Sequence, residues 1–138
     1  MPNSNYLTTT YNILVTGSNG QVGSEIKELS SNYNYNFFFT TRDDIDITSK
    51  DSIKEFCQTN SINVIINCAA YTAVDKAQSD IENADLVNRK AVKKLSIIAK
   101  ELNIKLIHIS TDYVFDGKNF KPYVEELRTN PQSVYGKT

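Results

Sequence analysis

The hydrophobic residues of the chain fall into short continuous runs that alternate with segments of helical spacing. Four runs have the length and apolar character of buried strands: NILVTG from Asn12, NFFFTT from Asn36, INVIINCAA from Ile62 and KLIHIS from Lys105. Between them, apolar positions recur at helical spacing over residues 20–31, 49–60 and about 80–103. Ser49 or Asp51 can cap the second of these helices. The predicted order is therefore β-α-β-α-β-α-β.

Strands that are apolar throughout and separated by helices are typical of a parallel sheet with both faces covered and right-handed crossovers. The pattern predicts an α/β fold with a doubly wound parallel sheet, truncated after its fourth strand and the following loop. Residues 111–138 combine turn formers, charges and tyrosines without periodicity, which predicts a long loop at the carboxyl end of a strand. Residues 1–10 have neither a basic start nor an apolar stretch, so we expect a flexible leader. Residues 11–138 then form one domain.

Composition narrows the class of protein. A chain of 138 residues is long enough for one compact core. With 40% hydrophobic residues, 22% charged residues and a net charge of -1, it has no signature of a nucleic-acid partner, a membrane span or a disordered chain. Cys57 and Cys68 form no short-spaced pair, so we expect reduced thiols, a buried Cys68 and a cytoplasmic location. No His, Cys and carboxylate residues have metal-ligand spacing, which predicts no metal site.

Three glycines follow the first predicted strand and open the first helix: Gly17, Gly20 and Gly23. In that position the first glycine permits a tight turn, the second lets the backbone approach a pyrophosphate, and the third lets helix and strand pack closely. The helix N-terminus adds free N–H groups and a partial positive charge. An isolated glycine motif is often only a turn, but its position at the first strand-to-helix junction predicts a Rossmann-type dinucleotide site. The residues between the glycines belong to the same predicted site: Ser18, Asn19, Gln21 and Val22.

The end of the second predicted strand indicates which dinucleotide binds. An NAD site usually has an acidic residue about 20 residues past the glycines that binds the ribose 2′-hydroxyl, whereas an arginine nearby favours the 2′-phosphate of NADP. The sequence reads Thr40-Thr41-Arg42-Asp43-Asp44, which predicts NADP(H). NAD(H) stays open, because Asp43 or Asp44 would bind the ribose if the strand ended later. Arg42 could also be a solvated loop charge.

Three further segments carry a resemblance that is more specific than the glycines. They are NCAAYTAVDKA from Asn67, STDYVFDG from Ser110 and NPQSVYGKT from Asn130. Together with the glycine turn and the segment Asp46-Ile47-Thr48, they resemble the dTDP-4-dehydrorhamnose reductase family of extended short-chain dehydrogenases/reductases. The resemblance covers nearly everything after residue 11. It implies NADPH-dependent reduction of the 4-keto group of dTDP-4-dehydrorhamnose, giving dTDP-rhamnose.

The resemblance also implies roles for individual residues. The glycine turn would cradle the cofactor's pyrophosphate, and the rest of the cofactor would lie along Asp46 and Ile47 at the adenine, then Cys68, Ala69, Ala70 and Tyr71 at the ribose and nicotinamide. Thr111 would hold and polarise the C4 ketone of the sugar, and Tyr135 would protonate the ketone oxygen. The other residues implied at the substrate pocket are Thr72, Val74, Asp75, Asp112 and Tyr113, beside Thr111 itself.

A tyrosine acid needs a nearby cation, because a free phenol has a pKa of about 10. In the family this cation is a lysine four residues on, which shares the helix face of the tyrosine. The sequence ends at Thr138, one position short of that lysine, and Lys137 is only two positions beyond Tyr135, on another face. We therefore expect a fragment of a longer reductase, engineered or natural, that is inactive by itself.

Simpler explanations exist for several of these residues. Taken singly, Thr111 could end a strand, Tyr135 could belong to a turn, and Asp75 with Lys76 could be a surface ion pair. His108, the only histidine, lies inside the fourth predicted strand and is expected as a satisfied core or boundary residue.

Two other functions stay open beside the reductase. One is an NAD-dependent epimerase or dehydratase acting on sugar nucleotides, against which Arg42 argues; the other is a regulatory subunit that binds a nucleotide without catalysis. The expected partner is a nucleotide-sugar substrate, with no nucleic acid and no membrane. The fourth strand would be an unpaired edge with apolar flanks, which predicts self-association into a homo-oligomer.

Overall fold

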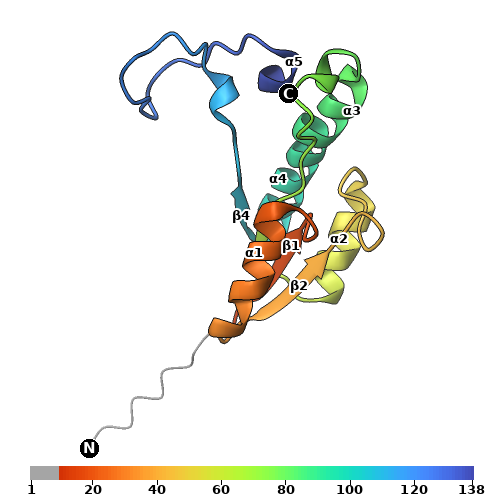
Figure 1. Ribbon diagram of the computed structural model, residues 1–138. Coiled ribbons are helices and arrows are strands. Elements are labelled where there is room, and N and C mark those ends of the chain that lie inside the picture. The colour runs from red at the N-terminus through yellow and green to blue at the C-terminus, as the bar shows by residue number, and fades with distance from the viewer. Residues whose placement is uncertain (1–9) are drawn as a thin grey trace, which may run out of the picture.

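The computed structural model describes residues 10–138, so the leader expected over residues 1–10 lies outside the described part except for its last residue. The centre of the fold is a parallel sheet in the order β2-β1-β3-β4. Its strands are β1 (Asn12–Thr16), β2 (Asn36–Thr40), β3 (Val64–Asn67) and β4 (Lys105–His108). Each lies within a predicted apolar run, and the prediction of a doubly wound parallel sheet is confirmed (Figure 1).

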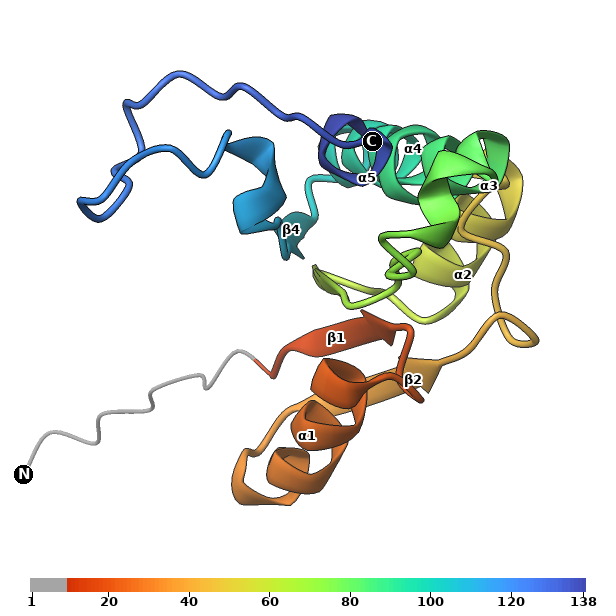
Figure 2. The ribbon, with the colours of Figure 1, turned by 45° about the horizontal axis from the view of Figure 1, so that its top comes forward.

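Helices lie on both faces of this sheet. Figure 2 shows α1 (Gln21–Leu29) on one side of β1, and α2 (Lys50–Thr59) and α4 (Val92–Glu101) on the other. The side chain of Ser49 accepts a hydrogen bond from the Ser52 N–H, so of the two predicted caps of α2 it is Ser49 that acts. The third predicted helix consists of three consecutive pieces, α3 (Ile81–Asp85), the π-helical segment η3 (Leu86–Ala91) and α4.

The larger part of the core lies between the sheet and the pair α2 and α4. Its fully buried members include Leu14, Ile53, Ile65, Leu95 and Ile98. A smaller cluster of Ile13, Val15 and Val64 lies on the opposite face, where Ile26 of α1 packs against it. Because successive side chains of a strand point to opposite faces, β1 is buried on both sides.

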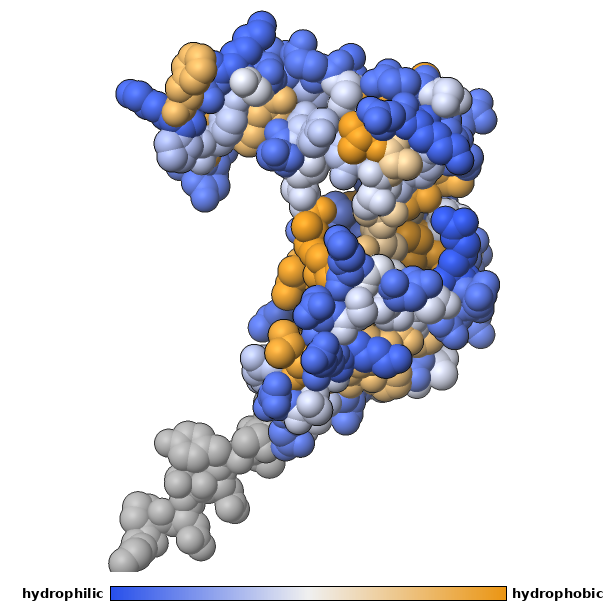
Figure 3. Space-filling view, in the orientation of Figure 1, coloured by the Kyte–Doolittle hydropathy of each residue, from blue (hydrophilic) through white to orange (hydrophobic). Residues whose placement is uncertain are grey.

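The strand β4 forms one edge of the sheet and pairs with β3 alone among the described residues. Ile107 is 53% exposed and Ile109 is 49% exposed. Figure 3 shows hydrophobic side chains on the concave side of the molecule, where β4 lies. The apolar edge expected for the fourth strand is therefore present, while self-association stays a prediction.

The segment after β4 is mostly irregular, as expected, but it includes two short helical turns. They are η4 (Asp112–Val114) and α5 (Val134–Lys137). Two further single turns, η1 (Ser30–Asn32) and η2 (Lys76–Gln78), occur earlier. A single turn is too short to produce a periodic pattern, which explains why periodicity predicted none of them. Within residues 10–138, no helix has the length and apolar character that crossing a bilayer requires.

Candidate functional site

The glycine turn is held by close backbone contacts. Gly17 has a φ of +65°, and a Cβ there would lie 2.6 Å from the backbone nitrogen of Ala69. A Cβ on Gly23 would lie 2.6 Å from the Cα of Ser18. The Gly20 N–H donates to the Gly17 carbonyl, and no side chain of the described residues caps the N-terminus of α1. The turn therefore requires glycine at positions 17 and 23, and N–H groups at the start of α1 are free for a ligand.

A cavity of about 770 Å³ opens beside this turn, at the carboxyl ends of β1, β2 and β3. Ligands of doubly wound sheets bind at the point where the strand order reverses, which here is the position of β1 between β2 and β3. The predicted cofactor residues that line the cavity are Gly17, Asn19, Gly20, Arg42, Asp46, Ile47, Cys68, Ala69, Ala70 and Tyr71. The structure thus brings four separate sequence segments to one site.

Four other predicted cofactor residues do not line this cavity. Ser18 is buried, and its N–H donates to the Thr40 carbonyl at 3.0 Å. Gly23 is buried beneath the turn, and Gln21 and Val22 are exposed on the first turn of α1. Ser18 and Gly23 therefore shape the glycine turn, but they do not line the cavity.

Arg42 lines the cavity, whereas the two carboxylates that follow it do not. The Asp44 carboxylate accepts hydrogen bonds from the Thr41 N–H at 2.7 Å and from the Thr41 hydroxyl at 2.8 Å. These bonds, the backbone one foremost, lower the pKa of Asp44. Within residues 10–138, Arg42 forms no ion pair. This arrangement leaves a free guanidinium at the cavity, which suits a phosphate group.

The loop after Arg42 holds Asp46 and Ile47, the two residues predicted to lie at the adenine. The Asp46 carboxylate accepts hydrogen bonds from the Thr48 hydroxyl at 2.7 Å and the Thr48 N–H at 2.8 Å, and these bonds lower the pKa of Asp46. The Lys94 ammonium donates to the Thr48 carbonyl and ties this loop to α4. The Asp46 side chain is thus engaged within its own loop, and the apolar lining at this end of the cavity comes from the half-buried Ile47 and the buried Ile45.

A smaller cavity of about 210 Å³ adjoins the first at Ala70, which lines both. The two predicted catalytic residues, Thr111 and Tyr135, line it together. Their elements are packed on each other: Gly136 of α5 lies against the Tyr113 carbonyl of η4, where a Cβ would not fit. The rings of Tyr113 and Tyr135 meet edge to face with centroids 5.5 Å apart. The structure therefore brings Thr111 and Tyr135 to one cavity.

The remaining predicted substrate residues line neither cavity: Thr72, Val74, Asp75, Asp112 and Tyr113. Thr72 and Asp75 are exposed ahead of η2, and the Tyr113 ring is used in packing on α5. For these five the expected pocket contact is not seen, because a resemblance in sequence gives the residue but not the direction of its side chain.

The structure also bears on two smaller points. Asp75 and Lys76, for which a surface ion pair was the simpler explanation, form no such pair among the described residues. Lys137 lines the same small cavity as Tyr135, Gly136 and Thr138, because these residues lie on or next to the single turn α5.

Part of the site was not predicted. The larger cavity is also lined by Asp80, Asn83, Leu86 and Val87 of α3, its N-cap and η3. The Tyr71 hydroxyl donates a hydrogen bond to the Asp80 carboxylate at 3.1 Å. Desolvation of the phenol is the larger cause, and this bond the smaller cause, of a raised pKa of Tyr71. Leu86 and Val87 belong to the apolar positions at helical spacing from about residue 80 to residue 103, which predicted only a helix. Their second role could not be read from helical spacing, because a π-helical segment changes the faces that its residues present.

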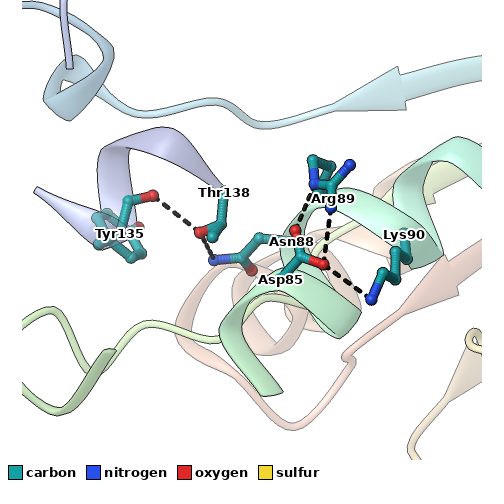
Figure 4. A network of polar contacts seen from close by, with 6 residues as sticks. All are labelled: Asp85, Asn88, Arg89, Lys90, Tyr135 and Thr138. Atoms are coloured by element: carbon teal, nitrogen blue, oxygen red, sulfur yellow. Dashed lines mark hydrogen bonds and ion pairs between the residues drawn. The ribbon is translucent and has the colours of Figure 1, made fainter. Parts of the chain in front are cut away.

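Asn88 of the π-helical segment joins the walls of the two cavities. Its Oδ1 accepts the Tyr71 N–H at 2.8 Å, and its Nδ2 donates to the Tyr71 carbonyl at 3.0 Å. The same Nδ2 lies 3.5 Å from the Thr138 hydroxyl, which donates to the Tyr135 carbonyl at 3.0 Å (Figure 4). No sequence signal pointed to this contact, because Asn88 is one of many polar residues along this helix.

The two thiols differ in environment. Cys57 is buried, and burial raises its pKa to about 11. Cys68 was expected to be buried as well, but it is only half-buried, because it follows the last residue of β3 and faces the larger cavity. Burial raises the pKa of Cys68 too. Across residues 10–138, no three His, Cys, Asp or Glu side chains are grouped for a metal ion.

Known proteins match the chain over nearly all of the described residues. The family model described as RmlD substrate binding domain matches residues 11–138. The dTDP-4-keto-6-deoxy-D-glucose reductase of Streptomyces niveus is 37% identical over 125 residues, which are 91% of this chain and 43% of that protein.

Two solved structures are similar in fold and sequence. A dTDP-4-dehydrorhamnose reductase from Clostridium acetobutylicum has a TM-score of 0.88 and 41% identity over 91% of this chain and 45% of its own. A dTDP-4-dehydrorhamnose reductase from Bacillus anthracis, in complex with NADP, has a TM-score of 0.89 and 30% identity over 93% of this chain and 46% of its own. The chain thus spans less than half the length of these relatives. Since the family model matches the chain from residue 11 onward, the chain belongs to the RmlD substrate binding domain family and is a homologue of the dTDP-4-dehydrorhamnose reductases.

Proposed function

We propose that residues 11–138 are the NADP(H)-binding domain of a reductase that converts the 4-keto group of dTDP-4-dehydrorhamnose to a hydroxyl, giving dTDP-rhamnose. The observation that carries this proposal is the cavity of about 770 Å³ beside the glycine turn, with Arg42 in its wall. Homology to reductases of dTDP-linked keto sugars supports the substrate class.

The residues present fit NADP(H). The pyrophosphate suits the free N–H groups of α1 and the turn at Gly17 and Gly20, where no side chain blocks the approach of a phosphate. The Arg42 guanidinium suits the 2′-phosphate. Ile47 offers apolar surface to the adenine, and residues 68–71 run along the side proposed for ribose and nicotinamide. When bound, the cofactor would supply the hydride for the sugar ketone.

The smaller cavity supplies two hydroxyls for the proton side of the reaction. Thr111 and Tyr135 line it together, so both can approach one carbonyl oxygen of a bound sugar. In this proposal the Thr111 hydroxyl orients the ketone by a hydrogen bond, and the Tyr135 phenol gives its proton to the oxygen that becomes the new hydroxyl. Asn88 holds the backbone of Tyr71 and, through Thr138, the turn of Tyr135.

The direct test of the cofactor proposal is Arg42→Ala. Loss of one charged hydrogen-bonding group at a phosphate is expected to weaken NADPH binding about 10-fold and to leave NADH binding within a factor of about 2. Isothermal titration with each cofactor measures both constants. Arg128→Ala is the matched control, because Arg128 is exposed and borders neither cavity. Equal weakening of NADPH and NADH by Arg42→Ala would contradict the phosphate role and favour the NAD-dependent epimerase.

Alkylation of the two thiols gives an independent test of where the cofactor lies. Cys68 lines the larger cavity, so NADPH at about 10 times its Kd is expected to slow the alkylation of Cys68 by iodoacetamide about 10-fold, because only the free protein reacts. Cys57 is the internal control: it is buried with a pKa of about 11, so it should react slowly with or without NADPH. Peptide mass spectrometry follows each thiol. Equal protection of both would indicate a general tightening of the fold instead of a ligand over Cys68.

A further inference from the structure

One polar residue from each strand forms a row across the carboxyl edge of the sheet. Thr40, Thr16, Asn67 and His108 are the last residues of β2, β1, β3 and β4, and they are register partners. The next row on the same face is apolar: Phe38, Leu14, Ile65 and Leu106. Thr16 and Asn67 are each 1% exposed. Buried polar groups are costly unless they are hydrogen-bonded, so Thr16 and Asn67 depend on the side-chain bonds that they form within this row.

The distances give these bonds a direction. The Thr16 hydroxyl oxygen lies 2.5 Å from Asn67 Oδ1, a separation that suits O–H···O and is too short for N–H···O. Thr16 therefore donates to the amide oxygen, which turns the amide nitrogen toward His108, 3.0 Å from Nδ1. An amide N–H can only donate, so Nδ1 accepts and the ring proton lies on Nε2. His108 lies on the exposed edge strand, and the partial desolvation of its ring lowers its pKa, which favours the neutral form.

The row has one member at each cavity. Thr16 lines the larger one, and His108 lines the smaller one with Thr111 and Tyr135. We propose that Asn67 is a positioning residue that fixes His108 as the Nε2–H tautomer, so that His108 donates a hydrogen bond to an oxygen of the sugar in the smaller cavity. The identity of the sugar rests on the proposed function; the tautomer does not.

The tautomer is measurable because His108 is the only histidine. Long-range ¹H–¹⁵N NMR of the imidazole in the 138-residue chain distinguishes the two ring nitrogens without assignment. We expect the proton on Nε2 in the wild type and on Nδ1 in Asn67→Asp, because a carboxylate only accepts and would require a donor at Nδ1. A folded Asn67→Asp variant that keeps the Nε2–H form would overturn the positioning role of Asn67.

Asn67→Asp buries a charge, which can destabilise the fold. Two uncharged valine variants therefore test the same row of hydrogen bonds. Thr16→Val removes the hydroxyl that orients the amide and is expected to let the Nδ1–H form appear. Thr40→Val is the matched control: Thr40 is equally buried, but its hydroxyl donates to the Val15 carbonyl and not to Asn67. The Thr40→Val variant should therefore keep His108 in the Nε2–H form. The same tautomer in both valine variants would overturn the relay from Thr16.

The contact with the sugar is tested by adding dTDP-rhamnose to the wild type. We expect the His108 Nε2–H signal to shift together with the signals of Thr111 and Tyr135, and the shift at the ring to disappear in Asn67→Asp. Shifts at Thr111 and Tyr135 with an unmoved Nε2–H signal would overturn the contact by His108. No shift at any of the three at millimolar dTDP-rhamnose would overturn the sugar part of the proposed function, and the tautomer measurement would still decide the role of Asn67.

Discussion

Replacement of Gly17 by alanine is expected to lower the free energy of unfolding by about 2–5 kcal/mol and to abolish NADPH binding. The new Cβ would lie 2.6 Å from the nitrogen and 2.7 Å from the Cα of Ala69, and 2.8 Å from the carbonyl carbon of Cys68. All three are backbone atoms, so the cavity wall after β3 would have to move. Urea unfolding followed by circular dichroism measures the loss of stability, and calorimetry measures the loss of binding.

Gly117→Ala separates the close approach from the strain of the left-handed backbone. Gly117 has a φ of +72°, similar to the +65° of Gly17, but no atom lies within 4 Å of a Cβ built there. We expect this variant to lose about 1–2 kcal/mol and to bind NADPH normally. If both variants lost the same stability, the contact between the glycine turn and residues 68–69 would contribute nothing.

Leu14→Ala is expected to have an effect of similar size, about 2–5 kcal/mol, through loss of core packing. Leu14 is 0% exposed and lies on the central strand β1, where it packs in the cluster between the sheet and the helices α2 and α4. Truncation would leave a cavity that its neighbours on two strands and two helices cannot all move to fill. The midpoint of urea unfolding reports the change.

Leu29→Ala is the matched control, because it truncates a leucine on the surface instead of one in the core. Leu29 is 54% exposed at the end of α1, so its truncation removes little buried area. We expect a loss below about 0.5 kcal/mol. An equal loss in Leu14→Ala and Leu29→Ala would contradict the position of the core between the sheet and the pair α2 and α4.

The main elements of the fold were predictable because the strands of a parallel sheet are apolar on both faces and are therefore visible as runs. The helical periodicity from about residue 80 gave one helix, but it could not show the π-helical segment Leu86–Ala91 within it. Sequence also left the cap of α2 between Ser49 and Asp51. That choice depends on which side chain reaches a free N–H, and only the structure gives that distance.

The residues that line the larger cavity were easier to predict than those expected around the smaller one. The glycines and Arg42 follow strands directly, so the sheet itself brings them to one edge. Asp75 and Tyr113 lie in turns, where no periodicity fixes the direction of a side chain, and neither lines a cavity. The row from Thr16 to His108 was missed for another reason: it follows register between strands, and each strand read alone shows only one polar residue at its end.

Binding of NADP(H) through the glycine turn and Arg42 is the basis of the proposed function. The measurement that tests it most directly is a paired calorimetric titration of the wild-type chain with NADPH and NADH. We predict binding of one NADPH per chain with a Kd about 10-fold lower than that of NADH, from the additional charged contact at the 2′-phosphate. Tighter binding of NADH, or no binding of either cofactor, would contradict the claim.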